Sequence, residues 1–234
     1  MAHRFYCEQL NEAGVVTLTE TEAHHLMHVL RGAPNDIVDV FNGNGLAATC
    51  RIATLRKREV ELEVVSFRRD TPPPTFLTLA TGVPKGDRFD WLIEKATELG
   101  VGRIIPLVTS RSVVDPRISK LDKLRQTVIS ACKQSGRNHL MEITKVHSWA
   151  DFVKQVIPEQ RVLIAHPQGD TWDSASCHPS TDLRPPCVAI GPEGGFSEEE
   201  FQTAISAGAH PVHLGRQILR IETAAIALAA KILL

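Results

Sequence analysis

The sequence lacks the features that mark several large classes of protein. Its five cysteines never form a Cys-x-x-Cys pair, which argues against both a disulfide framework and a zinc ribbon. No apolar run approaches the roughly 20 residues that span a bilayer, and Met1–Glu8 lacks the apolar core of a secretory leader. The sequence does not indicate a hydrolase or a phosphotransferase, because no Gly-x-Ser-x-Gly nucleophile motif, Walker phosphate-binding loop or set of kinase motifs occurs. We therefore expect a cytoplasmic protein without a membrane segment.

Neither sign of charge dominates the chain. The formal net charge is −1, so bulk charge does not predict binding to nucleic acid or to an acidic membrane. The distribution is uneven, however, because residues 85–145 hold twelve Lys or Arg against seven Asp or Glu, whereas residues 146–234 hold six against ten. The middle third is a candidate surface for an anionic partner, and ordinary solvated helix faces are the alternative.

Residues 1–70 show the two-residue alternation of strands. From Arg58 to Phe67, apolar Val60, Leu62 and Val64 alternate with glutamates, which predicts a half-buried antiparallel strand. The glycines in Asn42–Gly45 predict a hairpin turn, and this interpretation is favoured over a dinucleotide-binding loop because a strand pattern follows. A small β-barrel is the predicted result.

One helix is predicted within this barrel, starting at Thr19. Thr19 and Glu22 have the spacing of a capping box, and Ala23, Leu26 and Leu30 then form one apolar stripe. His24 and His28 have a spacing that suits two metal ligands. No third ligand accompanies them, so a solvated helix surface is favoured and no metal is predicted.

Three consecutive prolines, Pro72–Pro74, mark a stiff linker, and the period changes after it. Apolar strands now alternate with helices, which indicates a mainly parallel α/β sheet over residues 75–234. The predicted strands are 76–80, 103–108, 161–165, 187–190 and 211–214, and the predicted helices are 87–99, 118–134, 149–156, 198–207 and 222–233.

Two loops of this second region combine glycines with charged residues where a strand ends and a helix begins. The first is Gly191–Gly195, followed by a Ser197/Glu200 capping box, and the second runs from Leu214 to Ala224. Glycines there let backbone N–H groups approach a ligand closely, at the edge where open α/β sheets bind small molecules. A tight turn alone is the alternative for either loop, but two such loops in tandem favour a pocket.

These two loops carry a resemblance. Gly191-Pro-Glu-Gly-Gly195, Leu214-Gly215 and Ile218-Leu-Arg-x-Glu-Thr-Ala224 resemble the C-terminal motifs of the RsmE family, the 16S ribosomal RNA (uridine-N3) methyltransferases of the SPOUT superfamily. Further segments fall in the family's order, from Arg4-Phe-Tyr6 and His25–Arg31 to Ala131–Asn138 and Ala165-His-Pro167. Arg216-Gln217 and Ile221 depart from the common pattern of the last loop.

The resemblance implies a PUA-like RNA-binding β-barrel over residues 1–70 and a SPOUT-type α/β domain with a deep trefoil knot over residues 75–234. It also implies a homodimer that binds S-adenosyl-L-methionine without a metal and acts on 16S ribosomal RNA, either naked or in the assembled small subunit. The implied cofactor-binding residues are Leu163, Ala165, His166, Ile190, Gly191, Glu193, Gly194, Gly195, Leu214, Gly215, Ile218, Leu219, Arg220, Thr223 and Ala224.

Two ionic residues of the last loop are the candidates for catalysis. Uridine N3 carries a proton at neutral pH, so a guanidinium beside the base, from Arg220, would favour the N3 anion. Glu222 would accept the proton or orient Arg220, and a structural Arg220–Glu222 ion pair is the alternative. The predicted RNA-binding residues are Arg4, His25, Arg31, Lys85, Arg88, Lys95, Arg111, Lys133 and Arg137.

Two other functions stay open from the sequence. A ribose 2′-O-methyltransferase would share the knot, and only the methylated product would separate the two reactions. A non-catalytic RNA-binding protein would keep the barrel and the basic residues, but it would not need two glycine-bearing loops around one pocket.

Overall fold

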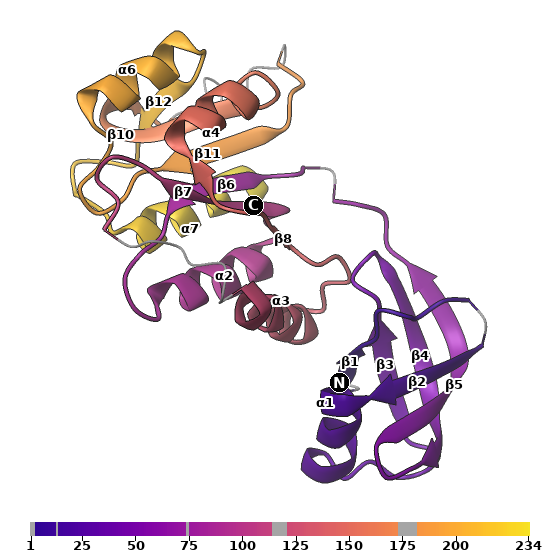
Figure 1. The fold of residues 1–234 in the computed structure, drawn as a ribbon. Coiled ribbons are helices and arrows are strands. Elements are labelled where there is room, and N and C mark those ends of the chain that lie inside the picture. The colour runs from indigo at the N-terminus through magenta and orange to yellow at the C-terminus, as the bar shows by residue number, and fades with distance from the viewer. Residues whose placement is uncertain (1–2, 13, 74, 114–120, 173–181) are drawn as a thin grey trace. The chain divides into compact units, whose positions relative to one another are not determined.

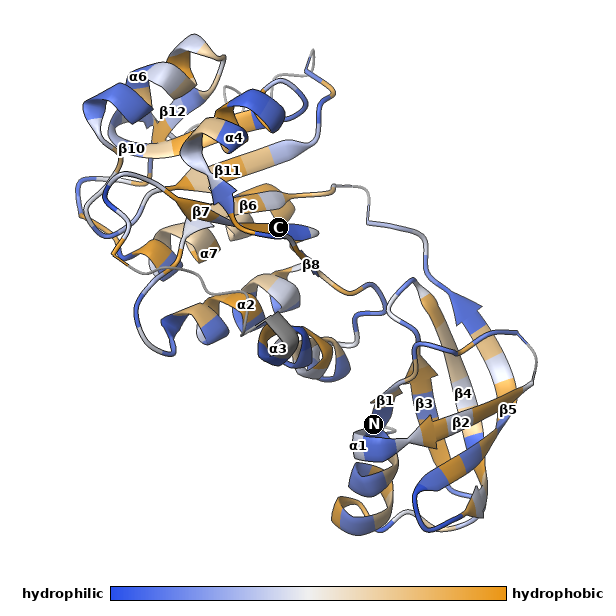
Figure 2. Cartoon of the chain, in the orientation of Figure 1, coloured by the Kyte–Doolittle hydropathy of each residue, from blue (hydrophilic) through white to orange (hydrophobic). Residues whose placement is uncertain are grey.

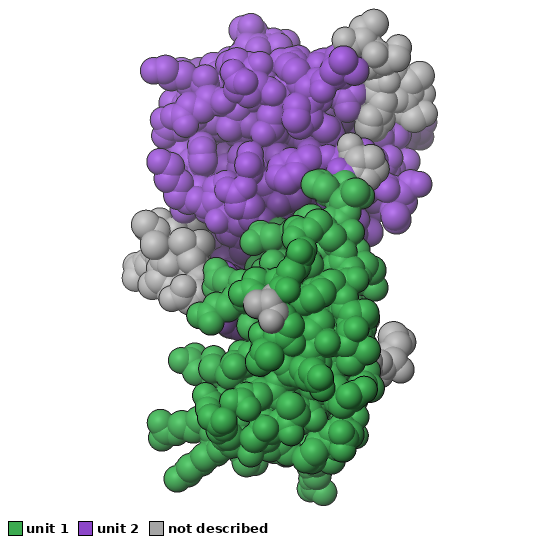
Figure 3. Space-filling view, turned by 90° about the vertical axis from the view of Figure 1, so that its right-hand side faces the viewer, with its two compact units in different colours: residues 1–72, 129–140 green, residues 73–128, 141–234 purple. Residues whose placement is uncertain are grey.

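The computed structural model describes residues 3–12, 14–73, 75–113, 121–172 and 182–234. The chain forms two compact units, coloured separately in Figure 3. Unit 1 comprises residues 1–72 and 129–140, and unit 2 comprises residues 73–128 and 141–234. Within the described residues, every helix is too short or too polar to cross a membrane.

Unit 1 is built on a curled five-stranded sheet (Figure 1). Its strands, in spatial order, are β1 (Arg4–Tyr6), β3 (Ile37–Phe41), β4 (Leu46–Leu55), β5 (Glu59–Arg69) and β2 (Val15–Thr19). Val60 and Leu62 of β5 are fully buried and Val64 packs against the same core, as the alternation predicted. Figure 2 shows hydrophobic and hydrophilic residues alternating along these strands.

The predicted hairpin between β3 and β4 is confirmed. Gly43 and Gly45 adopt φ values of 82° and 88°, in the left-handed region that favours glycine. A side chain at either position would also collide with Leu140 or His139, so these glycines allow close packing as well as the turn. The dinucleotide-loop alternative fails because β4, and no helix, follows.

A helical segment starts after Thr19 as predicted, but it is capped differently. Helix α1 (Glu20–His24) continues into a π-helical turn, η1 (His25–Val29). The predicted capping box is wrong, because the Thr19 side chain accepts no cap hydrogen bond. The Glu22 carboxylate instead accepts hydrogen bonds from the Lys133 ammonium and the Tyr6 N–H, and these long-range partners outcompete the local cap.

Unit 2 contains a seven-stranded parallel sheet. The spatial order is β12 (His210–His213), β10 (Arg161–Thr171), β11 (Pro186–Ile190), β6 (Thr78–Gly82), β7 (Arg103–Val108) and β8 (Glu142–Ile143), and β9 (His147–Ser148) also pairs with β7. The five predicted strands are confirmed, whereas the two-residue strands β8 and β9 are too short to show a period. Because every strand is parallel, all carboxyl ends lie at one edge of the sheet.

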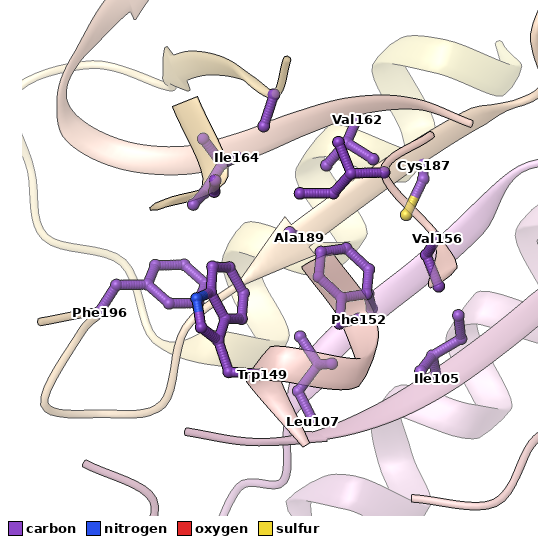
Figure 4. Packing of buried hydrophobic residues seen from close by; sticks show 14 of the residues in the cluster. Ile105, Leu107, Trp149, Phe152, Val156, Val162, Ile164, Cys187, Ala189 and Phe196 are labelled. Atoms are coloured by element: carbon purple, nitrogen blue, oxygen red, sulfur yellow. The ribbon is translucent and has the colours of Figure 1, made fainter. Parts of the chain in front are cut away.

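Helices cover both faces of this sheet (Figure 1). α2 (Arg88–Leu99) and α7 (Ile221–Leu233) pack on one face, and α4 (Trp149–Gln155) and α6 (Glu198–Ser206) on the other. α2 ends at Gly100, whose φ of 97° provides the left-handed C-cap. On the α4 side, Trp149 and Phe152 of α4 join Phe196 in an aromatic core above the strands (Figure 4).

Helix α3 (Leu121–Ser135) belongs to both units, because the division falls between residues 128 and 129. The segment after it joins unit 1 through Asn138, whose side chain accepts a hydrogen bond from Arg4 and donates one to Asp70. The residues between 114 and 120, where the prediction began this helix, lie outside the described part of the chain. The deep trefoil knot stays a prediction.

Candidate active site

The loops that carry the predicted site lie at the carboxyl edge of the parallel sheet. β6 leads through α2 to β7 on one side, and β11 leads through α6 to β12 on the other. The direction of the crossovers therefore reverses between the neighbouring strands β6 and β11. Open α/β sheets bind ligands at such switch points, which places the Gly191–Gly195 loop in the expected position for a ligand site.

Gly82 allows the two central loops to approach each other. It ends β6 beside β11, and a methyl group at this position would lie 2.9 Å from both the Cα and the N of Pro192. Backbone atoms cannot turn aside as a flexible side chain can. Gly82 is thus required for the close approach of the loop that contains Gly191 and Pro192, and the sequence analysis did not single it out.

Two arginines hold the glycine-rich loop in place. Arg111, in the loop after β7, donates from Nη1 to the carbonyl oxygens of Gly194 at 3.0 Å and Phe196 at 3.1 Å. Arg88, the first residue of α2, donates from Nη2 to Oε1 of Glu193 at 2.9 Å. The loop is therefore held both through its backbone and through its one charged side chain.

The predicted capping box at the start of α6 is confirmed. The Ser197 hydroxyl accepts from the Glu200 N–H, and the Glu200 carboxylate accepts from the Ser197 N–H at 2.8 Å. Glu200 is buried, and its second oxygen accepts from the Ser110 N–H at 2.7 Å. This carboxylate joins the loop after β7 to the glycine-rich loop, a role that lies beyond the local spacing from which the cap was predicted.

The second predicted loop is far more open. Residues 215–220 are all exposed, and Ile218 is 97% exposed. Gly215 has a φ of 127°, and its N–H donates to Nδ1 of His213 at 3.0 Å. Among the described residues, Arg220 has no side-chain partner, although its carbonyl accepts the Ala224 N–H that starts α7. Leu214, Leu219 and Thr223 belong to the same predicted loop.

Glu222 is buried in the first turn of α7. Its Oε1 lies 3.8 Å from Nη1 of Arg88, and its Oε2 is buried without a hydrogen-bond partner. A negative charge at this helix N-terminus is favourable, but a buried carboxylate oxygen without a donor is costly. The structure pairs Glu222 with Arg88, so the alternative of a structural Arg220–Glu222 ion pair is not found in the described part of the chain.

The end of β10 contains the remaining predicted cofactor-binding residues. Leu163 is buried and pairs with β11 and β12, whereas the pairing with β12 shifts register after Ala165. His166 leaves the ladder there and stacks on Phe201 of α6 with ring centroids 3.9 Å apart. Burial lowers the pKa of His166, while Glu198 acts in the opposite direction, so its neutral form is favoured.

Five predicted RNA-binding residues lie in unit 1, and three of them gather around β1. Lys133 lies over the Phe5 ring, at 5.4 Å from its centroid, and the His25 ring lies 6.1 Å from the same ring. Burial and the nearby Lys133 lower the pKa of His25. Arg4 donates to the carbonyl of Gly136 and to Asn138, so both Arg4 and Lys133 already have partners within the protein. The remaining residues of this group are Arg31 and Arg137.

The other four predicted RNA-binding residues lie in unit 2. Arg88 and Arg111 hold the glycine-rich loop as described, and Lys95 donates to Glu94 and Glu98 of its own helix. Lys85 is exposed, and its carbonyl accepts from Nε of Arg88 at 3.1 Å. Three of these four basic residues therefore form hydrogen bonds within unit 2, which the count of charges along the sequence could not show.

Comparisons with known proteins agree with this architecture. Residues 71–233 match the family model of an RNA methyltransferase domain, and residues 18–65 match that of an RNA methyltransferase PUA domain. The ribosomal RNA small subunit methyltransferase E of Bacillus subtilis is 30% identical over 93% of this chain and 89% of the relative. Its counterpart from Synechocystis is 34% identical over 96% of this chain and 75% of the relative.

Solved structures agree as well. A ribosomal RNA small subunit methyltransferase E from Neisseria gonorrhoeae, bound to S-adenosyl methionine, superposes with a TM-score of 0.87 at 32% identity, over 99% of this chain and 97% of that one. A putative methyltransferase from Legionella pneumophila, also with the cofactor bound, gives a TM-score of 0.85 at 31% identity over 99% and 96%. The resemblance found in the sequence is thereby confirmed, and the chain belongs to the RNA methyltransferase family that contains the ribosomal RNA small subunit methyltransferases E.

Proposed function

We propose that this protein transfers a methyl group from S-adenosyl-L-methionine to N3 of a uridine in 16S ribosomal RNA of the small ribosomal subunit. The observation that carries the proposal is the preformed glycine-rich loop at the switch point of the sheet, held by Arg88 and Arg111 beside a buried carboxylate that has a free oxygen. Membership of the RNA methyltransferase family supports the proposal, as does similarity to relatives that are ribosomal RNA small subunit methyltransferases E.

The residues of this edge suit the proposed cofactor. Gly191, Gly194 and Gly195 follow β11 without side chains, so a ligand can approach the backbone closely there, while Ile218 and Leu219 offer exposed apolar side chains to an adenine ring. The cofactor would lie among the ends of β10, β11 and β12. When bound, it supplies an electrophilic methyl group, and the protein's task is to align the acceptor, exclude water and stabilise charge.

Glu222 and Arg220 are the residues we assign to proton transfer and charge stabilisation. The acceptor N3 must lose its proton, and the free Oε2 of Glu222 is a buried acceptor with no competing donor among the described residues. Arg220 lies two residues before it, and its guanidinium, which has no partner among the described residues, can pair with the oxygens of a uracil anion. In this assignment Glu222 takes the proton and Arg220 stabilises the negative charge that remains on the base.

We assign RNA binding to the exposed basic residues, together with the barrel of unit 1. Lys85 and Arg31 are exposed, and the His25 ring lies beside Phe5 of β1. Phosphate contacts of this kind set affinity without reading sequence, whereas the base is read inside the pocket. Neutralising several of them is expected to weaken RNA binding and to flatten its salt dependence while cofactor affinity stays unchanged.

We also propose that the protein acts as a homodimer in the cytoplasm. The support for the dimer is α7, which is apolar around most of its surface and keeps Ile226, Ile232 and Leu233 only partly buried within a single chain. A second copy covering this face would bury them. The support for the cytoplasm is the family's ribosomal substrate.

The test is direct. Purified protein is incubated with unmethylated small ribosomal subunits and labelled S-adenosyl-L-methionine, and the labelled nucleoside is identified by mass spectrometry. We expect 3-methyluridine. A 2′-O-methylated nucleoside would overturn the choice of acceptor atom. No label together with measurable cofactor binding would reject this RNA as the substrate, and no cofactor binding would favour a non-catalytic RNA-binding protein.

A further inference from the structure

We propose that Arg88 is a positioning residue of the active site, which fixes the Glu222 carboxylate against the glycine-rich loop, and that it is not a phosphate contact. This inference rests on the proposed function of Glu222 as a proton acceptor. It replaces the role in RNA binding that the position of Arg88 within the basic middle third of the sequence suggested.

The first argument is that all three nitrogens of the Arg88 guanidinium have partners within unit 2. Nε donates to the Lys85 carbonyl at 3.1 Å, Nη2 donates to Glu193 at 2.9 Å, and Nη1 lies 3.8 Å from Oε1 of Glu222. An arginine recognises a phosphate by presenting two parallel N–H groups as a fork. Here that fork is divided between two carboxylates, which also neutralise its charge.

The second argument is that Arg88 connects three loops. Lys85 belongs to the loop after β6, Glu193 to the loop after β11, and Glu222 to the first turn of α7. These segments are distant in the sequence but meet at the carboxyl edge of the sheet. The planar guanidinium is rigid, so it fixes the distance between the Glu193 and Glu222 carboxylates.

The third argument concerns the two oxygens of Glu222. A separation of 3.8 Å between Nη1 of Arg88 and Oε1 of Glu222 is too long for a hydrogen bond but short enough for an ion pair, so Arg88 holds the carboxylate without occupying a hydrogen-bond acceptor site. Oε2 is buried and has no hydrogen-bond donor among the described residues, so it is free to accept a proton. A direct hydrogen bond would have stabilised the carboxylate at the expense of its availability.

Among the described residues, Arg88 is the one cation paired with Glu222, and Glu193 is the second carboxylate on the same guanidinium. Strands β6 and β11, which lie beneath α7, contain Cys187 as their one titratable residue, and burial raises the pKa of that thiol, so it stays neutral. On α2, Asp90 is paired with Lys123. The electrostatic environment of Glu222 thus depends on Arg88.

The catalytic test compares Arg88→Gln, which removes the charge, with Arg88→Lys, which keeps the charge but loses the fork, and with Lys154→Gln, an exposed control on α4. At saturating RNA and cofactor, Arg88→Gln is expected to lower kcat by about tenfold or more, as the loss of proton-transfer efficiency predicts. Arg88→Lys is expected to restore part of the rate, and Lys154→Gln is expected to match the wild type.

RNA binding separates this inference from its alternative. If Arg88 were a phosphate contact, Arg88→Gln would weaken RNA binding and lower the slope of log affinity against log salt by about one unit, while kcat at saturating RNA stayed normal. That outcome would overturn the proposal. We expect RNA affinity and salt slope within about twofold of the wild type, since the proposal leaves phosphate contacts intact. Failure of Arg88→Lys to restore any of the rate that Arg88→Gln loses would also overturn it.

A measurement without catalysis keeps the inference distinct from the proposed function. Thermal unfolding of Arg88→Gln, Glu222→Gln and the double variant forms a cycle that reports the coupling of the two side chains. Arg88→Gln is expected to lower the melting temperature because the buried Glu222 carboxylate loses its cationic partner. Adding Glu222→Gln is expected to recover most of that loss. Additive effects would contradict the coupling, whereas inactivity of the wild type with the coupling intact would reject the proposed reaction alone.

Discussion

The two loops predicted to hold the cofactor differ in how the folded chain supports them. The Gly191–Gly195 loop lies against Gly82, is held by Arg88 and Arg111, and leads into α6, whose N-terminus has the Ser197/Glu200 capping box. Residues 215–220 of the other loop are exposed, and the hydrogen bond from Gly215 to His213 is the main contact that shapes its start.

The difference suggests that the loops do different work. A loop whose backbone groups are already in place loses little conformational entropy when a ligand binds, so it suits the recognition of polar groups. An exposed loop with Ile218 at its tip gains most when apolar surface is covered, by the cofactor or by a second subunit. We therefore expect variants of the first loop to affect stability and variants of the second to affect binding.

The largest effect should come from Gly82→Ala, which breaks the support of the first loop. The added methyl group meets the Pro192 backbone at 2.9 Å, and a collision of this kind in a packed site costs about 2 kcal/mol. Chemical denaturation measures the loss. Gly194→Ala is the matched control, because its methyl group would lie 3.3 Å from Cβ of Arg111, a milder contact that a small shift relieves. Equal losses in both variants would mean that the backbone contact is not the constraint.

Ile218→Ser tests the second loop. The side chain is 97% exposed, so we expect the free energy of unfolding to stay within about 0.5 kcal/mol of the wild type. Cofactor affinity, measured by calorimetry, should fall about tenfold because apolar surface is no longer covered on binding. Leu183→Ser removes an equally exposed apolar side chain away from the loop and should change neither quantity. Unchanged affinity of Ile218→Ser would refute the role of this loop.

Comparing Ser197→Ala with Ser148→Ala tests whether the order of the glycine-rich loop or general stability controls cofactor affinity. Each serine caps a helix of unit 2, accepting from Glu200 and Asp151 respectively. Loss of either cap should cost about 1 kcal/mol in the free energy of unfolding. Only Ser197 adjoins the glycine-rich loop, so only Ser197→Ala should also weaken cofactor binding. A similar weakening in Ser148→Ala would show that general stability, and not loop order, controls affinity.

The smallest effect concerns pH and His166. Burial lowers the pKa of this histidine in the folded protein, so the unfolded chain binds the proton more readily. Its contribution to stability is complete above the unfolded pKa of about 6.5 and declines as the pH falls. The melting temperature should therefore fall less steeply between pH 7 and pH 5 in His166→Gln than in the wild type. Parallel curves would show that His166 does not titrate differently on folding.

Much of the local structure could be predicted from the sequence, because it depends on neighbours along the chain. The alternation of Val60 and Leu62 gave a buried strand face, Gly100 ended α2, and the Ser197/Glu200 spacing gave the cap of α6. The Thr19/Glu22 spacing was equally good but failed. Lys133, more than a hundred residues away, captures the Glu22 carboxylate, and such a partner leaves no trace in a local pattern.

The arrangement of the candidate site belongs to the tertiary structure. The sequence by itself determined that two glycine-bearing loops follow parallel strands and that their motifs resemble one family of RNA methyltransferases. Only the folded chain decided that Gly82 packs against Pro192, that residues 129–140 join unit 1, and that Arg88 lies between Glu193 and Glu222. The physical reason is that strand order brings distant segments to one edge of the sheet, where charge and close packing act between residues that no sequence period connects.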